Sequence, residues 1–403
     1  MTTNGTRIVD ADGHVLEPPD GMLQYAPAKF RDRIWHIEVR ADGSEWLHFN
    51  GASRPAGGLA LAGTAGMTMD DRNRARAGKM KYAEVRPGAF APEPRLPDMD
   101  VEGINQSVLY PTLLLSLPSV QDAEFAEVQA NAYNEWMAAF CRYSPKRLFG
   151  VAVVPTQDID RAVRTIRRAK ELGHVGVFMR PNPAIETRKF IDPIYDPIWR
   201  TCEELELPIG FHPFLAPDMP GACRALGYGA MRAQGVDYGK GSQADPVRNL
   251  GNIFFSQALS NPFDMMECVA LMCAGGILER FPRLTVLILE ANGGWIVSLL
   301  ERLDHHFEVF RWDVPSLKMK PSEYFRRQCY ISFDPDESTL AFTAQHPLVG
   351  ADRIIWASDY PHPDAKFPGV VAELRQATEP LTEAQRARIM GLNSAELYHL
   401  PAP

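Results

Sequence analysis

The sequence lacks several features that would place it in a specialised class of protein. No apolar run reaches the ~20 residues that span a bilayer, and the opening MTTNGTRIVDADGH contains no apolar core of a secretory signal. Lys and Arg total 42 against 50 Asp and Glu, without any basic block, so we expect no nucleic-acid-binding face. These absences predict a cytoplasmic protein that binds neither membranes nor nucleic acid.

Paired cysteines and a glycine-rich nucleotide loop are also missing. None of the 6 cysteines stands in a C-x-x-C pair, which favours reduced packing cysteines over a disulfide framework or a cysteine metal site. No Gly-rich turn follows the first apolar segment, as it would in a dinucleotide-binding sheet. What the chain does have is 45% hydrophobic and 23% charged residues, the balance of an ordinary globular enzyme.

Eight short apolar segments are typical of buried parallel strands. They are residues 7–12, 106–111, 148–155, 175–180, 208–212, 284–290, 329–334 and 353–359. Helical patterns lie between them, at residues 158–172, 195–205, 265–281, 295–310 and 337–346. This alternation predicts βαβ units, and eight of them favour an α/β fold of the closed (β/α)8 TIM barrel type. The alternative is a doubly wound open sheet.

Two stretches do not fit the repeat of strands and helices. Residues 30–97 contain two alternating runs around Asp42-Gly43, which predict a hairpin, and residues 213–250 are rich in Gly, Pro and Asp. Both follow predicted strands, the first and the fifth, whose C-terminal ends face the catalytic side of a barrel. We therefore predict one domain over residues 1–403, with a lid-like insertion at about 30–97 and a loop insertion at about 213–250. For the first insertion, surface decoration or an oligomer contact is an equal alternative.

Residue types that bind metals stand at the ends of three predicted strands. Asp12 and His14 end the first, His212 the fifth and Asp359 the eighth. Because the carboxyl ends of barrel strands meet at one rim, we expect these four residues to converge on one divalent cation. Asp10 shares a strand face with Asp12 and His14 and is expected to point the same way. Two imidazoles and two carboxylates suit zinc, manganese or iron without choosing among them.

Other polar residues follow the same rim. Glu290 closes the sixth predicted strand, and we expect it to transfer protons or bind metal. Arg180 ends the fourth, where it is a candidate for binding an anionic substrate, with an ion pair at the rim as the equal alternative. A second metal could use Glu17, Glu290, His305 and His306. The two histidines stand 15 and 16 positions beyond Glu290 on a predicted helix that rises ~1.5 Å per residue, so one ion is favoured over two.

Several motifs together resemble the amidohydrolase superfamily, in the branch related to aminocarboxymuconate-semialdehyde decarboxylase. They are IVDADGHVLEP, GVFMRPNP, FHP, GGILERFPRLTVLILEANGGWIVSLLERLD, SDYPHPD and IMGLNSAELYHL, spread over nearly the whole predicted barrel. The resemblance implies a mononuclear metal, with Asp12-x-His14 where the family often has His-x-His, and with His212 and Asp359 as further ligands. No lysine ends the fourth predicted strand, so the carbamate-bridged dimetal site of other amidohydrolases is not expected.

The resemblance also implies roles for other residues. Arg302 corresponds to an arginine that binds a substrate carboxylate across a dimer interface, so we expect a homodimer or a heteromer with a paralogue. We expect a hydrolase or decarboxylase of a small organic carboxylate or amide, in which Asp359 takes a proton that Glu290 or His362 shuttles. Glu290 stands where the decarboxylases usually have a histidine, which leaves two alternatives open: a dinuclear iron or manganese monooxygenase of the same family, and a non-catalytic metal-binding paralogue.

Overall fold

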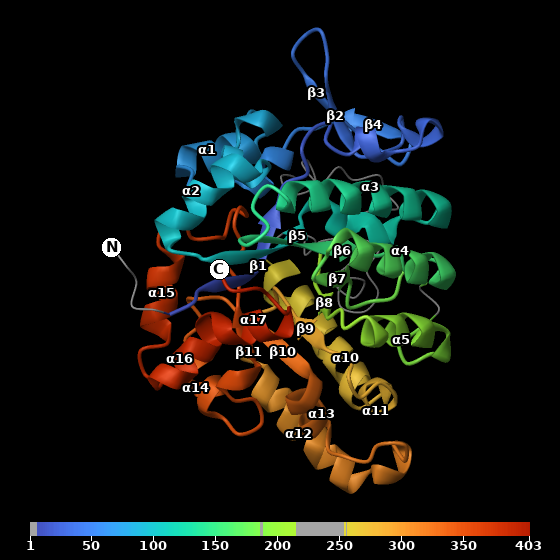
Figure 1. Ribbon diagram of the computed structural model, residues 1–403, viewed down its shortest axis with the longest axis vertical. Helices are drawn as coiled ribbons and strands as arrows, with labels where there is room; N and C mark the ends of the chain where they lie inside the picture. Colours follow the sequence, from blue (N-terminus) through green and yellow to red (C-terminus); the bar gives the residue numbers. More distant parts are fainter. Residues whose placement is uncertain (1–5, 186–187, 215–253, 255) are drawn as a thin grey trace.

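The computed structural model describes residues 6–185, 188–214, 254 and 256–403 (Figure 1). Its main sheet has eight strands, all paired in parallel in the order in which they occur along the chain. They are β1 (Val9–Val15), β5 (Gln106–Pro111), β6 (Leu148–Val153), β7 (Gly176–Met179), β8 (Ile209–Phe211), β9 (Val286–Ile288), β10 (Cys329–Phe333) and β11 (Ile354–Trp356). The (β/α)8 barrel prediction is confirmed, and the open-sheet alternative is excluded.

The first and last strands meet and close the barrel near its C-terminal rim. The amide of His14 donates to the carbonyl of Tyr360 at 2.8 Å, and the amide of Asp359 donates to the carbonyl of Asp12 at 3.2 Å. Seven of the eight strands are buried at every residue, as expected for a sheet that is covered on both sides. Backbone hydrogen bonds thus join two of the predicted metal-binding segments directly.

Helices surround the barrel (Figure 1). They are α3 (Ala123–Cys141), α4 (Ile159–Leu172), α5 (Asp196–Glu204), α10 (Asn261–Cys273), α11 (Ile277–Arg280), α12 (Ile296–Val309), α13 (Pro321–Gln328), α14 (Leu340–Gln345), α15 (Val370–Ala377), α16 (Glu383–Ala387) and α17 (Asn393–Leu397). α4 shows why the sequence predicted its bounds: the side chain of Asp158 accepts from the amide of Arg161, and Gly173 ends the helix at φ 88°.

The long segment between β1 and β5 forms a layer outside the barrel. It contains a three-stranded antiparallel sheet of β2 (His36–Val39), β3 (Glu45–Phe49) and β4 (Ala52–Pro55), and the helices α1 (Met69–Arg76) and α2 (Pro92–Glu102). The predicted hairpin around Asp42-Gly43 joins β2 to β3. The sheet stands at one end of the molecule beyond α3 (Figure 1). The second predicted insertion lies almost entirely outside the described residues.

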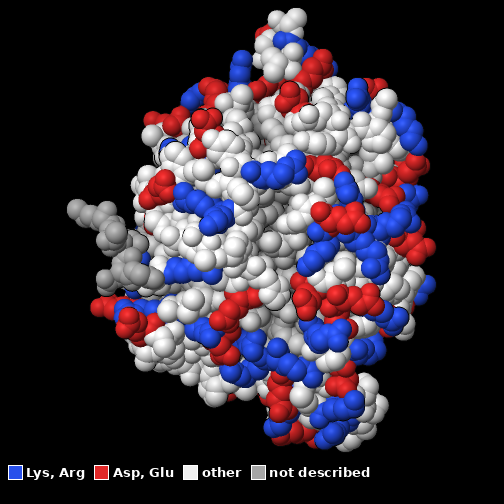
Figure 2. Space-filling view, in the orientation of Figure 1, with Lys and Arg blue, Asp and Glu red and all other residues white. Residues whose placement is uncertain are grey.

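Arginines on α4 form ion pairs with acidic residues of α3. Arg161 and Arg164 both pair with Glu127 of α3, and Arg168 pairs with Glu135. On the face drawn in Figure 2, basic and acidic side chains are mixed over α3, α4 and α5. Exposed ion pairs are screened by solvent, so these contacts hold the neighbouring helices together only weakly. No helix among the described residues is long and apolar enough to cross a membrane.

Candidate metal centre and active site

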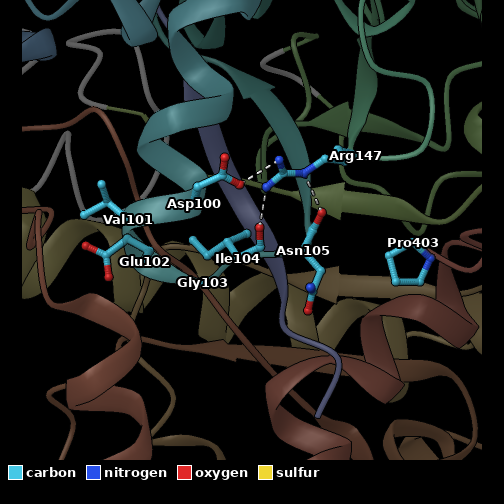
Figure 3. A pocket seen from close by; sticks show the side chains of 8 residues that line it. All are labelled: Asp100, Val101, Glu102, Gly103, Ile104, Asn105, Arg147 and Pro403. Atoms are coloured by element: carbon cyan, nitrogen blue, oxygen red, sulfur yellow. Dashed lines mark hydrogen bonds and ion pairs between the residues drawn. The ribbon is translucent and has the colours of Figure 1, made fainter. Parts of the chain in front are cut away.

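A hollow of about 510 Å³ lies at the end of the barrel where β5 and β6 begin (Figure 3). Arg147 crosses it, with an ion pair to Asp100 at 2.8 Å and hydrogen bonds to the carbonyls of Ile104 and Asn105. These contacts hold the guanidinium against the start of β5. The catalytic side of a (β/α)8 barrel is the opposite end, so this hollow is not the candidate site.

A bulge in β1 directs the side chains of its acidic residues to different neighbours. The register against β5 shifts between Asp10 and Gly13, which interrupts the alternation of side chains. Asp10 consequently accepts hydrogen bonds from Ser107 Oγ at 2.7 Å and from the amide and Oγ of Ser358 at 3.0 and 2.8 Å. A Cβ atom at Gly13 would stand 2.4 Å from Asp10 Oδ2, so the bulge requires glycine there. The expectation that Asp10 joins Asp12 and His14 at the mouth is wrong.

Asp12, His14 and His212 form one group that could hold a metal, with ligand atoms all within 4.8 Å of one another. The Nε2 atoms of the two histidines are 3.3 Å apart, and Asp12 Oδ1 lies 3.7 Å from the first and 3.9 Å from the second. All three side chains are buried. Asp12 Oδ1 has no hydrogen-bond partner among the described residues. A buried carboxylate oxygen of this kind is costly unless a cation or a donor faces it.

Backbone carbonyls fix the direction of both imidazole rings. Nδ1 of His14 is 2.8 Å from the carbonyl of Pro111, and Nδ1 of His212 is 2.7 Å from that of Pro213. Each Nδ1 therefore carries a proton, which leaves Nε2 facing the acidic centre, as in metal-binding histidines. The residues present thus fit a divalent cation with nitrogen and oxygen ligands.

A second group shares His14 with the first and contains Glu290, Asp359 and His362. Asp359 Oδ1 lies 3.5 Å from His14 Nε2 and 2.6 Å from His362 Nδ1. The structure thereby brings all four predicted ligands and the three predicted catalytic residues to one place. Glu290 and Asp359 both have positive φ, 40° and 52°. Such a backbone costs ~1–3 kcal/mol per residue and is concentrated at functional sites.

Glu290 is held from two sides. Its Oε2 lies 2.8 Å from His212 Nε2, and its Oε1 accepts a hydrogen bond from Gln257 Nε2 at 3.0 Å. Gln257 belongs to a π-helical turn, η8 (Ser256–Ser260), directly before α10. Sequence reasoning missed Gln257, because no local pattern distinguishes a π-turn from an α-helix.

The centre attracts positive charge. Burial raises the pKa of Asp12 to about 8, because it penalises the ionised carboxylate. Burial lowers the pKa of His212, but Glu290 and Asp12 outweigh it and raise this pKa to about 9. Burial, together with Asp364 and Glu290, raises the pKa of Asp359 well above its ordinary value. A proton or a metal cation therefore stabilises this cluster of carboxylates.

The remaining predicted residues are placed differently. Glu17 is fully buried, with its carboxylate on backbone amides of residues 112–114. Arg180 is buried directly beyond β7. Arg302, His305 and His306 lie on α12, the first two exposed. Among the described residues, neither candidate metal group contains Glu17, His305 or His306, so the structure does not bring the predicted second-metal set together.

Thr112 is a further polar residue at the mouth. It follows β5, and its Oγ1 lies 3.1 Å from Nε2 of His362. A polar residue directly after a barrel strand is the signal that revealed Asp12, His212 and Asp359, so the same rule applied to the second strand would have found it.

The amidohydrolase family model matches residues 9–400. The chain belongs to this family. Gamma-resorcylate decarboxylase of Polaromonas sp. (strain JS666) is 24% identical over 314 residues, which cover 75% of this chain and 85% of the relative. The enzyme of the same name from Rhodococcus jostii (strain RHA1) is 26% identical over 336 residues, covering 78% and 92%.

Solved structures agree on the fold of this amidohydrolase. An amidohydrolase of Mycobacterium avium subsp. paratuberculosis K-10 matches with a TM-score of 0.74 at 20% identity, over 98% of this chain and 100% of that one. Dihydroxybenzoic acid decarboxylase of Polaromonas sp. JS666, with bound manganese and the inhibitor 2-nitroresorcinol, matches with a TM-score of 0.62 at 19% identity, over 100% and 98%. The protein is therefore an enzyme of the amidohydrolase family whose curated relatives are decarboxylases, and its buried ligand groups could hold a divalent metal ion. None of these matches favours the monooxygenase alternative.

Proposed function

We propose that this amidohydrolase removes carbon dioxide from a small hydroxylated aromatic acid. The observation that carries the proposal is the hydrogen bond of 2.6 Å between His362 and Asp359 beside the candidate ligands. This contact supports a proton-handling role for the pair beside the candidate ligands, in a chain whose characterised relatives include four gamma-resorcylate decarboxylases. The proposed ligands are Asp12, His14, His212 and Asp359, and the proposed metal is manganese, which relatives bind in their structures.

The reaction needs one proton delivered to the ring carbon that carries the carboxylate. The carbon–carbon bond then breaks, its electron pair returns to the ring, and carbon dioxide leaves. A bound divalent cation would hold and polarise the oxygen atoms of the substrate. Asp359 and His362 would hold the proton between Oδ1 and Nδ1 until the ring carbon takes it. Glu290, next to His212, would return a proton from solvent.

We infer that Arg180 binds the substrate anion, because it is a buried cation at the end of a barrel strand. Arg302 is exposed on α12, so it could reach a substrate only in a neighbouring subunit. We therefore propose a homodimer in which α12 lies at the interface; a heteromer with a paralogue is the second option. One ion per chain is proposed, because the two ligand groups share His14.

We also infer one domain, in which the segment before β5 covers the mouth. The amide of Ala65 donates to the carbonyl of Pro361 at 3.0 Å, and the amide of Leu16 donates to that of Ala89 at 2.8 Å. Arg95 of α2 donates to the carbonyl of His14 at 2.7 Å. These contacts join the insertion to β1 and to the segment after β11, which carry three of the four proposed metal ligands, and this supports a lid-like role over surface decoration.

The test is turnover by protein purified without added metal and then loaded with manganese. Substrates are 2,6-dihydroxybenzoate, 5-carboxyvanillate and, as a control, the amide of the first. We expect release of carbon dioxide from at least one acid and none from the amide, with activity lost on chelation. Hydrolysis of the amide, or oxygen consumption with either acid, would replace decarboxylation by one of the alternatives.

A further inference from the structure

Both ring nitrogens of His362 are engaged. Nδ1 lies 2.6 Å from Asp359 Oδ1, and Nε2 lies 3.1 Å from Thr112 Oγ1. The ring also lies against the ring of His14, with centroids 4.2 Å apart. The imidazole is therefore held in one orientation from three sides, and the hydroxyl of Thr112 is one of the three.

The two hydrogen bonds select a tautomer of His362. A metal cation at the proposed site would keep Asp359 ionised despite its raised pKa. An ionised carboxylate only accepts hydrogen bonds, so Nδ1 of a neutral ring must carry the proton. Nε2 then has a lone pair and accepts the hydrogen bond that the Thr112 hydroxyl donates. Without this hydroxyl, Nε2 would lose its hydrogen-bond partner, and only Asp359 and the contact with the ring of His14 would hold the imidazole.

Thr112 is itself held by Glu17. The carboxylate of Glu17 accepts from the amides of Thr112 at 3.2 Å, Leu113 at 3.0 Å and Leu114 at 2.9 Å. These amides open the short helix η6 (Leu113–Ser119), whose N-terminal end favours a negative charge. Burial raises the pKa of Glu17 to about 7, although these amides lower it, so the amides are what stabilises its ionised form.

We propose that Thr112, with Glu17 behind it, is a positioning residue that fixes the orientation of His362 and pairs with its Nε2. Glu17 acts only by holding the backbone of Thr112, and Thr112 acts only through His362. The inference deepens the proposed function, since it rests on His362 handling a proton in decarboxylation. It also accounts for Glu17, which the sequence singled out but which belongs to neither metal group.

The first test compares Thr112→Val, Thr112→Ser and the control Thr165→Val in manganese-loaded protein. Thr165 of α4 is a buried threonine whose hydroxyl has no hydrogen-bond partner among the described residues. For Thr112→Val we expect kcat to fall on the order of 10–100-fold, within the range of acid–base contributions. KM, metal content and Tm should match Thr165→Val, and Thr112→Ser should restore kcat. Equal kcat in the two valine variants would overturn the proposal.

A second readout does not depend on turnover. In zinc-loaded protein with 15N-labelled histidine, the ring nitrogens of His362 should show a protonated Nδ1 and an unprotonated Nε2. Thr112→Val should move the Nε2 signal, while Thr112→Ser and Thr165→Val should leave it in place. An unchanged signal refutes the inference even in an active enzyme. A changed signal in a protein that decarboxylates nothing supports it and refutes only the proposed reaction.

The role of Glu17 is tested by Glu17→Gln alone and combined with Thr112→Val. If Glu17 acts through Thr112, the double variant should have the same kcat as Thr112→Val. The effects of two coupled residues do not add, so the second change should cause no further loss of kcat. Losses that multiply would show that Glu17 acts by another route and would overturn its part. If Glu17→Gln does not fold, Glu17→Asp replaces it, with the same expectation.

Discussion

Asp12 is the residue whose surroundings argue most directly for a metal. Its Oδ1 is buried without a hydrogen-bond partner among the described residues, and two histidine Nε2 atoms lie within 4 Å of it. Asp12→Asn keeps the size of the side chain but removes its charge. We expect metal affinity to fall by at least ~10–100-fold, measured as metal per chain after dialysis against a weak chelator. Asp336→Asn, an exposed change beyond β10, should keep its metal; equal metal contents would remove Asp12 from the ligand set.

The shifted pKa values of Asp12 and His212 predict how the metal-free protein responds to pH. The pKa of Asp12 rises from 3.8 to about 8, and that of His212 from 6.5 to about 9. At any pH between the ordinary pKa of either group and its raised pKa in the folded chain, the folded chain binds more protons than the unfolded chain. The free energy of unfolding therefore falls as pH rises through this range. The Tm of metal-free protein should therefore decrease from pH 6.5 to 9. Saturating manganese should flatten this decrease, and a Tm that rises over the same range without metal would contradict the assignment.

At the level of elements, Asp10 stabilises the closure of the barrel. Its carboxylate joins β1 to β5 through Ser107, and β1 to the end of β11 through the amide and hydroxyl of Ser358. In Asp10→Asn, the side-chain NH2 group replaces one carboxylate oxygen and faces a group that donates to Asp10, so one of these hydrogen bonds is lost. We expect a loss of about 1–3 kcal/mol in the free energy of unfolding, measured by denaturant titration of the metal-free chain. Thr165→Val serves as the matched buried control, and an equal stability of the two would show that the closure does not depend on Asp10.

The strands were predictable because burial on both faces leaves continuous apolar runs. The end of β8 at Phe211 and of β11 at Trp356 fall within the predicted segments 208–212 and 353–359, and this placed His212 and Asp359 at the rim. The bulge in β1 was not predictable, because it depends on how Gly13 packs against Asp10, which is a tertiary contact.

Other features also depended on contacts between distant segments. β4 was not predicted, because its residues have weak β-propensity. The sequence feature that could have indicated it is the preceding Asn50-Gly51 turn, where both residues have positive φ. Glu17 was a candidate metal ligand in the sequence, yet its carboxylate accepts hydrogen bonds from backbone amides about 95 residues further along the chain. His305 and His306 lie on the helix that follows Glu290, but the helix carries them away from the mouth, as its rise predicts.

On the scale of the whole molecule, we propose that the dimer interface includes the C-terminal end of α12. Val309, Phe310 and Trp312 are exposed there, Trp312 by 71%. His306 stacks on Phe310, and Trp312 packs edge-on against it, so these side chains form one aromatic surface. Contiguous apolar surface on a protein commonly marks an interface, and this one lies at the C-terminal end of the helix that carries Arg302.

Trp312→Glu should therefore weaken association while leaving the barrel intact. We expect the wild type to sediment as a dimer at micromolar concentration and the variant to dissociate at ~10-fold or more higher concentration, because interface tryptophans often contribute ≥ 2 kcal/mol. Phe342→Glu, on another exposed aromatic side chain (α14), is the control and should stay dimeric. If the variant also loses activity in proportion to its monomer fraction, Arg302 completes the site of its neighbour. A wild type that sediments as a monomer would contradict the proposed dimer. Arg180 would then be the proposed anion-binding residue within each chain.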